Sequence, residues 1–97
     1  MKEKRGYVYF MSNRKGGVNY IGVTSDLVQR VYQHKEGLAD GFTKKYNLKI
    51  LVYFEYHDSI VEAILAEKKL KNIRREKKVG IIERENPEWK DLYETIV

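Results

Sequence analysis

The sequence predicts an α+β domain in which a small antiparallel sheet is flanked by helices, in the order ββαβαα. Two observations carry this prediction: two short strand-like segments separated by a glycine-containing turn, and helical periodicity that begins only after them. The 97 residues can bury one modest core, and a hydrophobic content of 42% favours a folded chain over a disordered one. We therefore expect residues 1–97 to form a single domain.

The first two strands form a predicted hairpin. Residues 7–11 are rich in strand formers, residues 13–17 hold two adjacent glycines suited to a turn, and residues 18–23 form the return strand. Side chains of a strand alternate between its two faces, so the register decides whether Tyr9 and Tyr20 share a face. We expect a register in which the residue numbers of two opposed residues sum to 29, so that Tyr9 pairs with Tyr20.

The remaining elements are helices around one further strand. Ser25 is the expected N-cap of a helix over residues 26–35, and Gly37 ends it. Residues 48–56 are dense in aliphatic and aromatic side chains and form the strongest predicted strand. Three further helices are predicted: residues 60–73 after a capping box of Ser59 and Glu62, residues 74–85 ended by Pro87, and a short helix over residues 88–95 docked by Trp89 and Leu92.

Composition excludes several classes of protein. The absence of cysteine rules out disulfides and thiolate metal sites. The apolar runs are too short to span a membrane, and no apolar segment follows the basic residues at the start, so we expect a cytoplasmic protein without a membrane partner. A net charge of +5 is compatible with a nucleic-acid partner.

The positive charge is concentrated in one stretch. Residues 67–78, EKKLKNIRREKK, hold seven Lys or Arg against two Glu, and this local +5 equals the excess of the whole chain. Two interpretations stay open, a solvated helix face and a surface that binds phosphates.

Polar residues also interrupt apolar helix faces. Arg30 and His34 lie four residues apart, beside the apolar Leu27 and Val31. One interpretation is that both residues belong to a functional site. The other is that Arg30 lays its aliphatic stem along the apolar surface and His34 is a hydrogen-bonded residue at the boundary of the core. Glu67 is the sharper exception, since a carboxylate on an apolar face is costly unless it is paired or binds a cation. One interpretation is that Glu67 forms an ion pair, with Arg30 or with a lysine. The other is that it acts as a metal ligand or as a general base. The apolar face around it is predicted to comprise Ile60, Ala63, Ile64 and Leu70.

Together these irregular positions suit phosphodiester hydrolysis. A carboxylate can hold one hard divalent ion, and an arginine can stabilise charge on phosphate oxygens. A phenol or an imidazole can accept a proton from water. The set comprises Tyr9, Tyr20, Arg30, His34 and Glu67.

The same residues carry a family resemblance. Tyr7-Val8-Tyr9, followed after ten residues by Tyr20-Ile21-Gly22, resembles the signature of the GIY-YIG nuclease superfamily. The run Y-I-G-V-T-S-D-L-V-Q-R-V-Y-Q-H continues as that family does, and E-A-I-L-A-E-K-K-L-K resembles its metal-binding helix. The resemblance covers about residues 6–80 and is greatest to small stand-alone bacterial members, the UPF0213 or YhbQ-like group.

The resemblance implies a three-stranded antiparallel sheet and a DNA endonuclease that uses one Mg²⁺ or Mn²⁺. It implies that Tyr9 acts as general base or positions water, that Tyr20 contacts the scissile phosphate or shares the base role, and that Arg30 stabilises the transition state. The other implied roles are orientation or activation of a tyrosine by His34, metal binding by Glu67, and close approach of the substrate backbone at Gly22.

Two family features are missing. Val23 stands where many relatives carry a lysine, and residues 79–82 lack the asparagine that several relatives place there. We expect Lys44 or Lys45 to replace the missing charge. Further phosphate contacts are expected from Lys68, Lys71 and Arg75.

The predicted function is a metal-dependent DNA endonuclease that hydrolyses phosphodiester bonds, selective for DNA structure or directed by a protein partner. The alternative is a catalytically weak or inactive nucleic-acid-binding or assembly module on the same scaffold. The intact set of five residues favours the enzyme, whereas the missing lysine and asparagine count against it.

Overall fold

A computed structural model describes residues 4–39 and 41–97. The elements follow the predicted ββαβαα order, with the short α2 added after α1 and the predicted short last helix present as α5. They are β1 (Gly6–Ser12), β2 (Asn19–Thr24), α1 (Leu27–Lys35), α2 (Phe42–Lys45), β3 (Ile50–His57), α3 (Ile60–Lys71), α4 (Arg75–Glu85) and α5 (Tyr93–Ile96). The α+β class is therefore confirmed.

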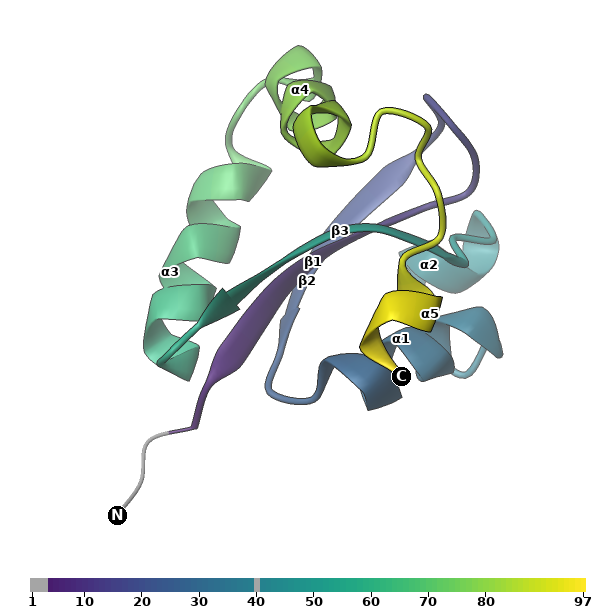
Figure 1. Ribbon diagram of the computed structural model, residues 1–97. Coiled ribbons are helices and arrows are strands. Elements are labelled where there is room, and N and C mark those ends of the chain that lie inside the picture. The colour runs from purple at the N-terminus through teal and green to yellow at the C-terminus, as the bar shows by residue number, and fades with distance from the viewer. Residues whose placement is uncertain (1–3, 40) are drawn as a thin grey trace.

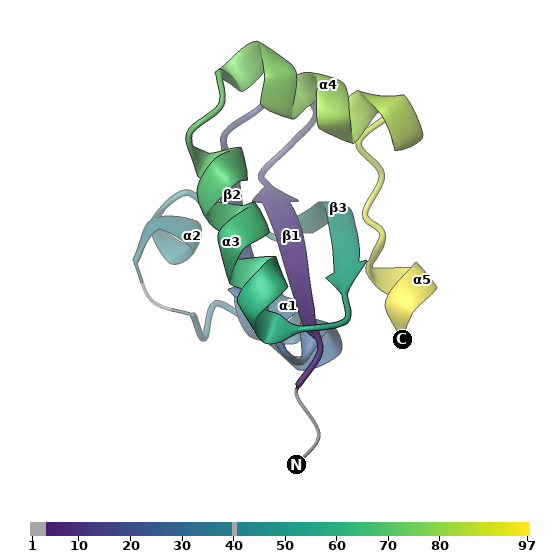
Figure 2. The same ribbon diagram turned by 90° about the vertical axis from the view of Figure 1, so that its left-hand side faces the viewer.

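The three strands form one antiparallel sheet in the order β2-β1-β3. In Figure 1 the helix α3 lies on one side of this sheet, and α1, α2 and α5 lie on the other. Figure 2 shows α3 in front of the strands and α4 across one end of them. Since β1 is central and β2 is an edge strand, the two signature tyrosines lie on adjacent strands at one side of the sheet.

Alternation along β1 divides the core into two clusters. Val8 and Phe10 face α3 and α4, whereas Tyr9 and Met11 face α1, so the Tyr9 ring is already directed at the helix that carries Arg30. The first cluster contains Val8, Phe10, Ile21, Val52, Ala63, Ile82 and Trp89, and the second contains Tyr9, Met11, Leu27, Val31, Leu48 and Leu51.

The register of the hairpin differs from the predicted one. The residue numbers of two opposed residues sum to 31, so Tyr9 pairs with Gly22 and Tyr20 pairs with Met11. The shift is two residues, and two residues preserve the face because strand side chains alternate with period two. Tyr9 and Tyr20 therefore still share a face, with ring centroids 6.3 Å apart.

The longer turn explains this shift. The loop spans residues 13–18 and is closed by a hydrogen bond of 3.4 Å from Asn13 N to the Val18 carbonyl oxygen. Inside it, Gly17 N donates to the Arg14 carbonyl oxygen at 3.0 Å, and Gly16 has a φ of +69°. This inner turn needs the left-handed conformation that glycine adopts readily, and it adds residues that a minimal hairpin lacks.

Helix ends differ in detail from the predicted ones. The N-cap of α1 is Asp26 rather than Ser25, because the Asp26 carboxylate accepts from Gln29 N. Ser59 caps α3 as predicted and accepts from the amides of Val61 and Glu62. The last helix is shorter than predicted. In the segment before it, the Asn86 side chain donates to the Lys90 carbonyl oxygen and accepts from Lys90 N, and it also donates to the Val52 carbonyl oxygen of β3.

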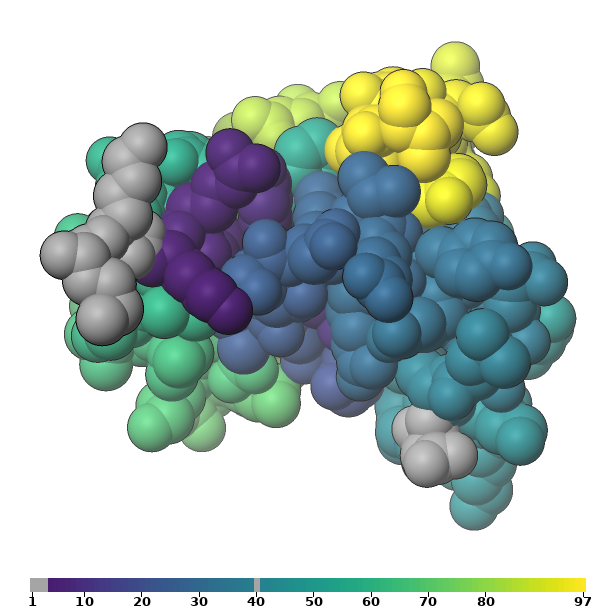
Figure 3. Space-filling view, turned by 90° about the horizontal axis from the view of Figure 1, so that it is seen from below, coloured from purple at the N-terminus to yellow at the C-terminus, as the bar shows by residue number. Residues whose placement is uncertain are grey.

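The C-terminal segment packs beside α1. In Figure 3 the yellow C-terminal residues lie against the blue residues of that helix, which fixes α1 on its outer side. Within residues 4–39 and 41–97, no helix is long and apolar enough to cross a membrane.

Candidate active site

The site is built around the buried hydroxyl of Tyr9. Tyr9 is 1% exposed, and its hydroxyl lies 3.0 Å from Nε2 of His34. Arg30 Nε donates to the same hydroxyl at 3.3 Å. Arg30 and His34 reach Tyr9 together because they are one turn apart on α1, on the face that packs against the sheet.

His34 links Tyr9 to Thr43 through its two ring nitrogens. Burial, followed by the charge of Arg30, lowers the pKa of His34 to about 4, so the imidazole is neutral at pH 7. Because Tyr9 accepts from Arg30, its own hydrogen is available to His34 Nε2. In the tautomer with the imidazole proton on Nδ1, that nitrogen donates to Thr43 Oγ1, which lies 3.0 Å away. This tautomer gives a directed chain from Arg30 through Tyr9 and His34 to Thr43.

The protonation of Tyr9 is set mainly by burial. The pKa of Tyr9 is raised to about 12, chiefly by burial. The nearby Tyr20 and Glu67 also raise this pKa, whereas the hydrogen bond and the charge of Arg30 lower it. Hydrogen bonding to Tyr9 in turn raises the pKa of Arg30, with Tyr20 contributing. Arg30, Tyr20 and Glu67 thus all act electrostatically on Tyr9, which places these three predicted residues around its hydroxyl.

Gly22 has a different place from the expected one. Its backbone is buried, and a Cβ built on it would lie 2.5 Å from the Tyr9 hydroxyl and 2.9 Å from Cε2 of Tyr20. The space at Gly22 is therefore occupied by the tyrosines themselves. The glycine allows the Tyr9 hydroxyl to cross the neighbouring strand, and it does not open a path for a substrate backbone.

Glu67 reaches the site from the opposite side of the sheet edge. Its side chain is 14% exposed and lies 3.5 Å from Lys71 Nζ, one turn further along α3. The same ammonium lies 5.9 Å from the centroid of Tyr20, so it links the carboxylate to the tyrosines. Of the two predicted ion-pair partners, the contact is with a lysine and not with Arg30, which bonds Tyr9 and Gln33.

The apolar face around Glu67 is narrower than predicted. Ala63 is fully buried, and Ile60 and Leu70 pack against the same core cluster. Ile64, by contrast, is 37% exposed, so its assignment to that face was wrong. Glu67 keeps its predicted place, because positions 60, 63, 67 and 70 follow one stripe of a helix.

The donor set fits a single Mg²⁺ or Mn²⁺ rather than a metal held by protein alone. Among residues 4–39 and 41–97, no three His, Asp or Glu side chains come together as a metal cage. Glu67 is a partly buried carboxylate that forms an ion pair with the half-exposed Lys71. Mg²⁺ commonly binds through one or two carboxylates and completes its shell with water and substrate phosphates. Glu67 is the residue that would hold such an ion.

The basic residues fall into two groups. Lys44 and Lys45 are exposed on α2, beside the Thr43 that bonds His34, and Lys68 is exposed on α3. Arg75 is engaged differently, since its guanidinium donates to the carbonyl oxygens of Gly16 and Gly17 at 2.9 Å. Arg75 thereby ties α4 to the hairpin loop, which is a structural task.

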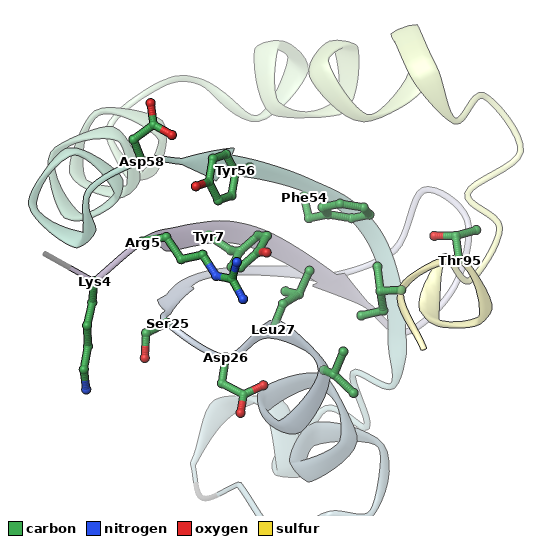
Figure 4. A pocket seen from close by; sticks show the side chains of 12 residues that line it. Lys4, Arg5, Tyr7, Ser25, Asp26, Leu27, Phe54, Tyr56, Asp58 and Thr95 are labelled. Carbon is green, nitrogen blue, oxygen red and sulfur yellow. The ribbon is translucent and has the colours of Figure 1, made fainter. Parts of the chain in front are cut away.

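A hollow of about 1010 Å³ lies outside this cluster. Figure 4 shows Tyr7, Phe54 and Tyr56 of the sheet on one side of it and the start of α1 on the other. Its charged residues are Lys4, Arg5, Asp26 and Asp58, which balance. None of the five predicted catalytic residues lines it, so the chemistry and this hollow do not coincide.

Two residues of the site were missed by sequence reasoning. Thr43 Oγ1 lies 3.0 Å from Nδ1 of His34, and Gln33 Oε1 accepts from Arg30 Nη1 at 2.9 Å. Gln33 could have been found, since it lies three residues from Arg30 on the same helix. Thr43 carries no such signal, because it lies on a different helix, α2, and meets His34 only through the fold.

The state of His34 predicts a specific loss of stability in acid. Since the pKa of His34 is lowered from 6.5 to about 4, the unfolded chain binds this proton first as the pH falls. Stability is therefore lost between pH 6.5 and 4, by about 3 kcal/mol in all. Chemical unfolding at several pH values, compared with His34→Gln, measures this difference in slope. Parallel curves for the two proteins would show that His34 titrates normally.

Comparison with known proteins places this site in a family. The model of the GIY-YIG catalytic domain matches residues 5–80, which include all five predicted catalytic positions. The chain belongs to the GIY-YIG family.

Its relatives are UPF0213 proteins. The chain is 32% identical over 76 residues to a UPF0213 protein of Staphylococcus saprophyticus, covering 78% of this chain and 92% of the relative. A UPF0213 protein of Pediococcus pentosaceus is 28% identical over 79 residues, with 81% and 83% covered. The solution NMR structure of a UPF0213 protein from Bacillus halodurans superposes with a TM-score of 0.56 at 26% identity, covering 90% of this chain and 92% of that one. The family suggests a nuclease, while the name UPF0213 states no activity.

Proposed function

We propose that this protein is a metal-dependent DNA endonuclease that hydrolyses phosphodiester bonds. The observation that carries the proposal is the hydrogen-bonded chain from Arg30 through Tyr9 to His34, beside Tyr20 and opposite Glu67. A purely structural set would not need a partly buried carboxylate and an arginine at the same edge of the sheet.

Arg30 supplies positive charge to the phosphate. A guanidinium carries five N–H donors in a plane, so Arg30 can serve Tyr9 and Gln33 and still donate to phosphate oxygens. Its bond to Tyr9 fixes the orientation of that plane before substrate arrives. Tyr20 is less buried than Tyr9 and lies between Tyr9 and the surface residue Phe42, where it can contact the phosphate.

Tyr9 and His34 handle a proton as a pair. With a pKa of about 12, Tyr9 is a neutral phenol and not a resident base. It can take a proton from the attacking water only while its own hydrogen passes to Nε2 of neutral His34. Thr43 supports this transfer, because it accepts from Nδ1 and keeps Nε2 unprotonated.

Glu67 would hold the divalent ion, which supplies charge neutralisation on the phosphate oxygens when bound. Without that ion, the carboxylate would repel a phosphate placed near Tyr20. Lys71 offsets part of this repulsion, since it contacts Glu67 and lies over the Tyr20 ring.

A cleavage assay tests the proposal. Branched, nicked, single-stranded and duplex DNA would be incubated with the protein in Mg²⁺, in Mn²⁺ and in EDTA. We expect cleavage with either metal and none in EDTA, and we expect Arg30→Ala to lose activity on every substrate. Metal-independent cleavage, or binding without any cleavage, would contradict the proposal; the second result would support the binding-module alternative.

The lysines of α3 are expected to contribute to DNA binding through phosphates. Each lost phosphate contact flattens the dependence of log K on log salt by about one unit. Lys68→Gln with Lys71→Gln should therefore lower the slope by about two units. The control removes the same charge with Lys4→Gln and Lys90→Gln; Lys4 lies at the other end of α3, where its carbonyl oxygen accepts from Ile60 N. An equal change in both double variants would assign Lys68 and Lys71 to a solvated face.

A further inference from the structure

Helix α2 and the residue that caps its C-terminus expose two aromatic rings that the proposed chemistry does not use. Phe42 is 45% exposed and Tyr46 is 41% exposed. The Phe42 ring stacks on Tyr20 with centroids 6.4 Å apart and an interplanar angle of 29°, and its centroid lies 4.7 Å from that of Tyr46. Tyr20, Phe42 and Tyr46 form a continuous row of rings, called here the aromatic row, that leads from the candidate site to solvent.

Positive charge accompanies the aromatic row along its length. Lys45 Nζ lies 5.4 Å from the centroid of Tyr46, and Lys71 Nζ lies 5.9 Å from that of Tyr20. Lys44 is exposed on the same short helix, and residues 41–49 contain no acidic side chain. Aromatic rings interleaved with cations are the arrangement with which proteins bind single-stranded nucleic acid, because the rings stack on bases and the cations meet phosphates.

The aromatic row is held in a fixed position relative to the site. Thr43, between Phe42 and Lys44 in the chain, is 4% exposed and bonds His34 through its hydroxyl. Its carbonyl oxygen also accepts from Leu48 N at 2.9 Å, and Leu48 is fully buried. The same threonine therefore orients the imidazole and anchors the helix that carries the rings.

We propose that Phe42 and Tyr46 stack on the base of an unpaired nucleotide next to the phosphate held at Tyr20 and Arg30. This inference rests on the proposed function and adds its substrate class: DNA with an unpaired nucleotide at the cut, as in single strands, flaps and frayed ends. Inside a duplex both faces of each base are already stacked, so the aromatic row can be used there only after a base leaves the helix, which costs free energy.

The hollow of Figure 4 is the competing place for such a base, since Tyr7, Phe54 and Tyr56 line it. Its balanced charges offer no net attraction to phosphates, and it does not contain Tyr20. The aromatic row has both features, which is why it is assigned here.

Binding measured in EDTA tests the assignment without relying on cleavage. Fluorescence anisotropy would compare a labelled single-stranded oligonucleotide with its duplex for the wild type and for Phe42→Ala with Tyr46→Ala. We expect the double variant to weaken single-strand binding by about tenfold or more and to leave duplex binding within about twofold. The conservative pair Phe42→Tyr with Tyr46→Phe keeps both rings and should bind like the wild type.

Tyr56→Ala is the matched control, because Tyr56 is an exposed ring of the hollow. It should leave single-strand binding unchanged. Three results would each overturn the proposal. The alanine pair could lose equal affinity for single strand and duplex, it could lose no affinity at all, or the loss of affinity could be confined to Tyr56→Ala. A protein that cleaves DNA but binds normally without Phe42 and Tyr46 would leave the proposed function standing. A protein that binds single strands through these rings but never cleaves would remove the function and keep the binding site.

Discussion

Gly22→Ala is expected to lower both stability and cleavage sharply, although it adds one methyl group. The new Cβ would lie 2.5 Å from the Tyr9 hydroxyl and 2.6 Å from its Cζ, so one of the two must shift. Tyr9 is 1% exposed and held by Arg30 and His34, so it cannot move aside without breaking the hydrogen-bonded chain. Overpacking of this kind costs about 1–3 kcal/mol.

Denaturant unfolding and a cleavage assay on the same samples measure the two effects. Gly80→Ala provides the control, because a Cβ on Gly80 meets no atom within 4 Å and alanine favours helices. It should gain up to about 1 kcal/mol and cleave normally. A fully stable and active Gly22→Ala protein would show that Tyr9 does not need its observed position.

Glu67→Gln is expected to abolish cleavage while leaving the fold intact. Its partner Lys71 is half exposed, and such a pair contributes no more than about 1 kcal/mol. Loss of a buried ion pair with Arg30 would instead cost about 3–5 kcal/mol. The structure gives Arg30 bonds to Tyr9 and Gln33, so we expect the smaller value.

Thermal melts with and without Mg²⁺ separate loss of a metal ligand from loss of a structural charge. A ligand that binds the folded protein at about ten times its Kd stabilises it by about 1.4 kcal/mol. The melting temperature of the wild type should therefore rise with Mg²⁺, and that of Glu67→Gln should not. A large drop in the melting temperature of the variant in EDTA would contradict the ligand assignment.

Local patterns were sufficient to predict most of the fold. The strands and the long helices follow from periodicity and from caps such as Ser59, which accepts from the first amides of α3. The register of the hairpin was predicted two residues away, because the sequence does not show that Arg14 and Gly17 close an inner turn. The two tyrosines share a face in either case, since both registers have the same parity.

The candidate site was predictable where it depends on a motif or on one helix. Arg30 and His34 stand out because they interrupt an apolar stripe, and Glu67 stands out for the same reason on α3. The contacts between elements could not be predicted in the same way. That Gly22 makes room for Tyr9, and that Thr43 bonds His34, depends on how segments distant in the chain meet.

Single-turnover cleavage tests whether Glu67 and the Arg30–Tyr9–His34 chain form one hydrolytic site. Three proteins would be compared: the wild type, Glu67→Gln and the control Glu62→Gln. Each would be mixed separately, in molar excess over single-stranded DNA, in the presence of Mg²⁺. Glu62 lies exposed on the same helix. We expect equal rates for the wild type and Glu62→Gln and no cleavage by Glu67→Gln. Cleavage by Glu67→Gln at the wild-type rate would contradict this expectation.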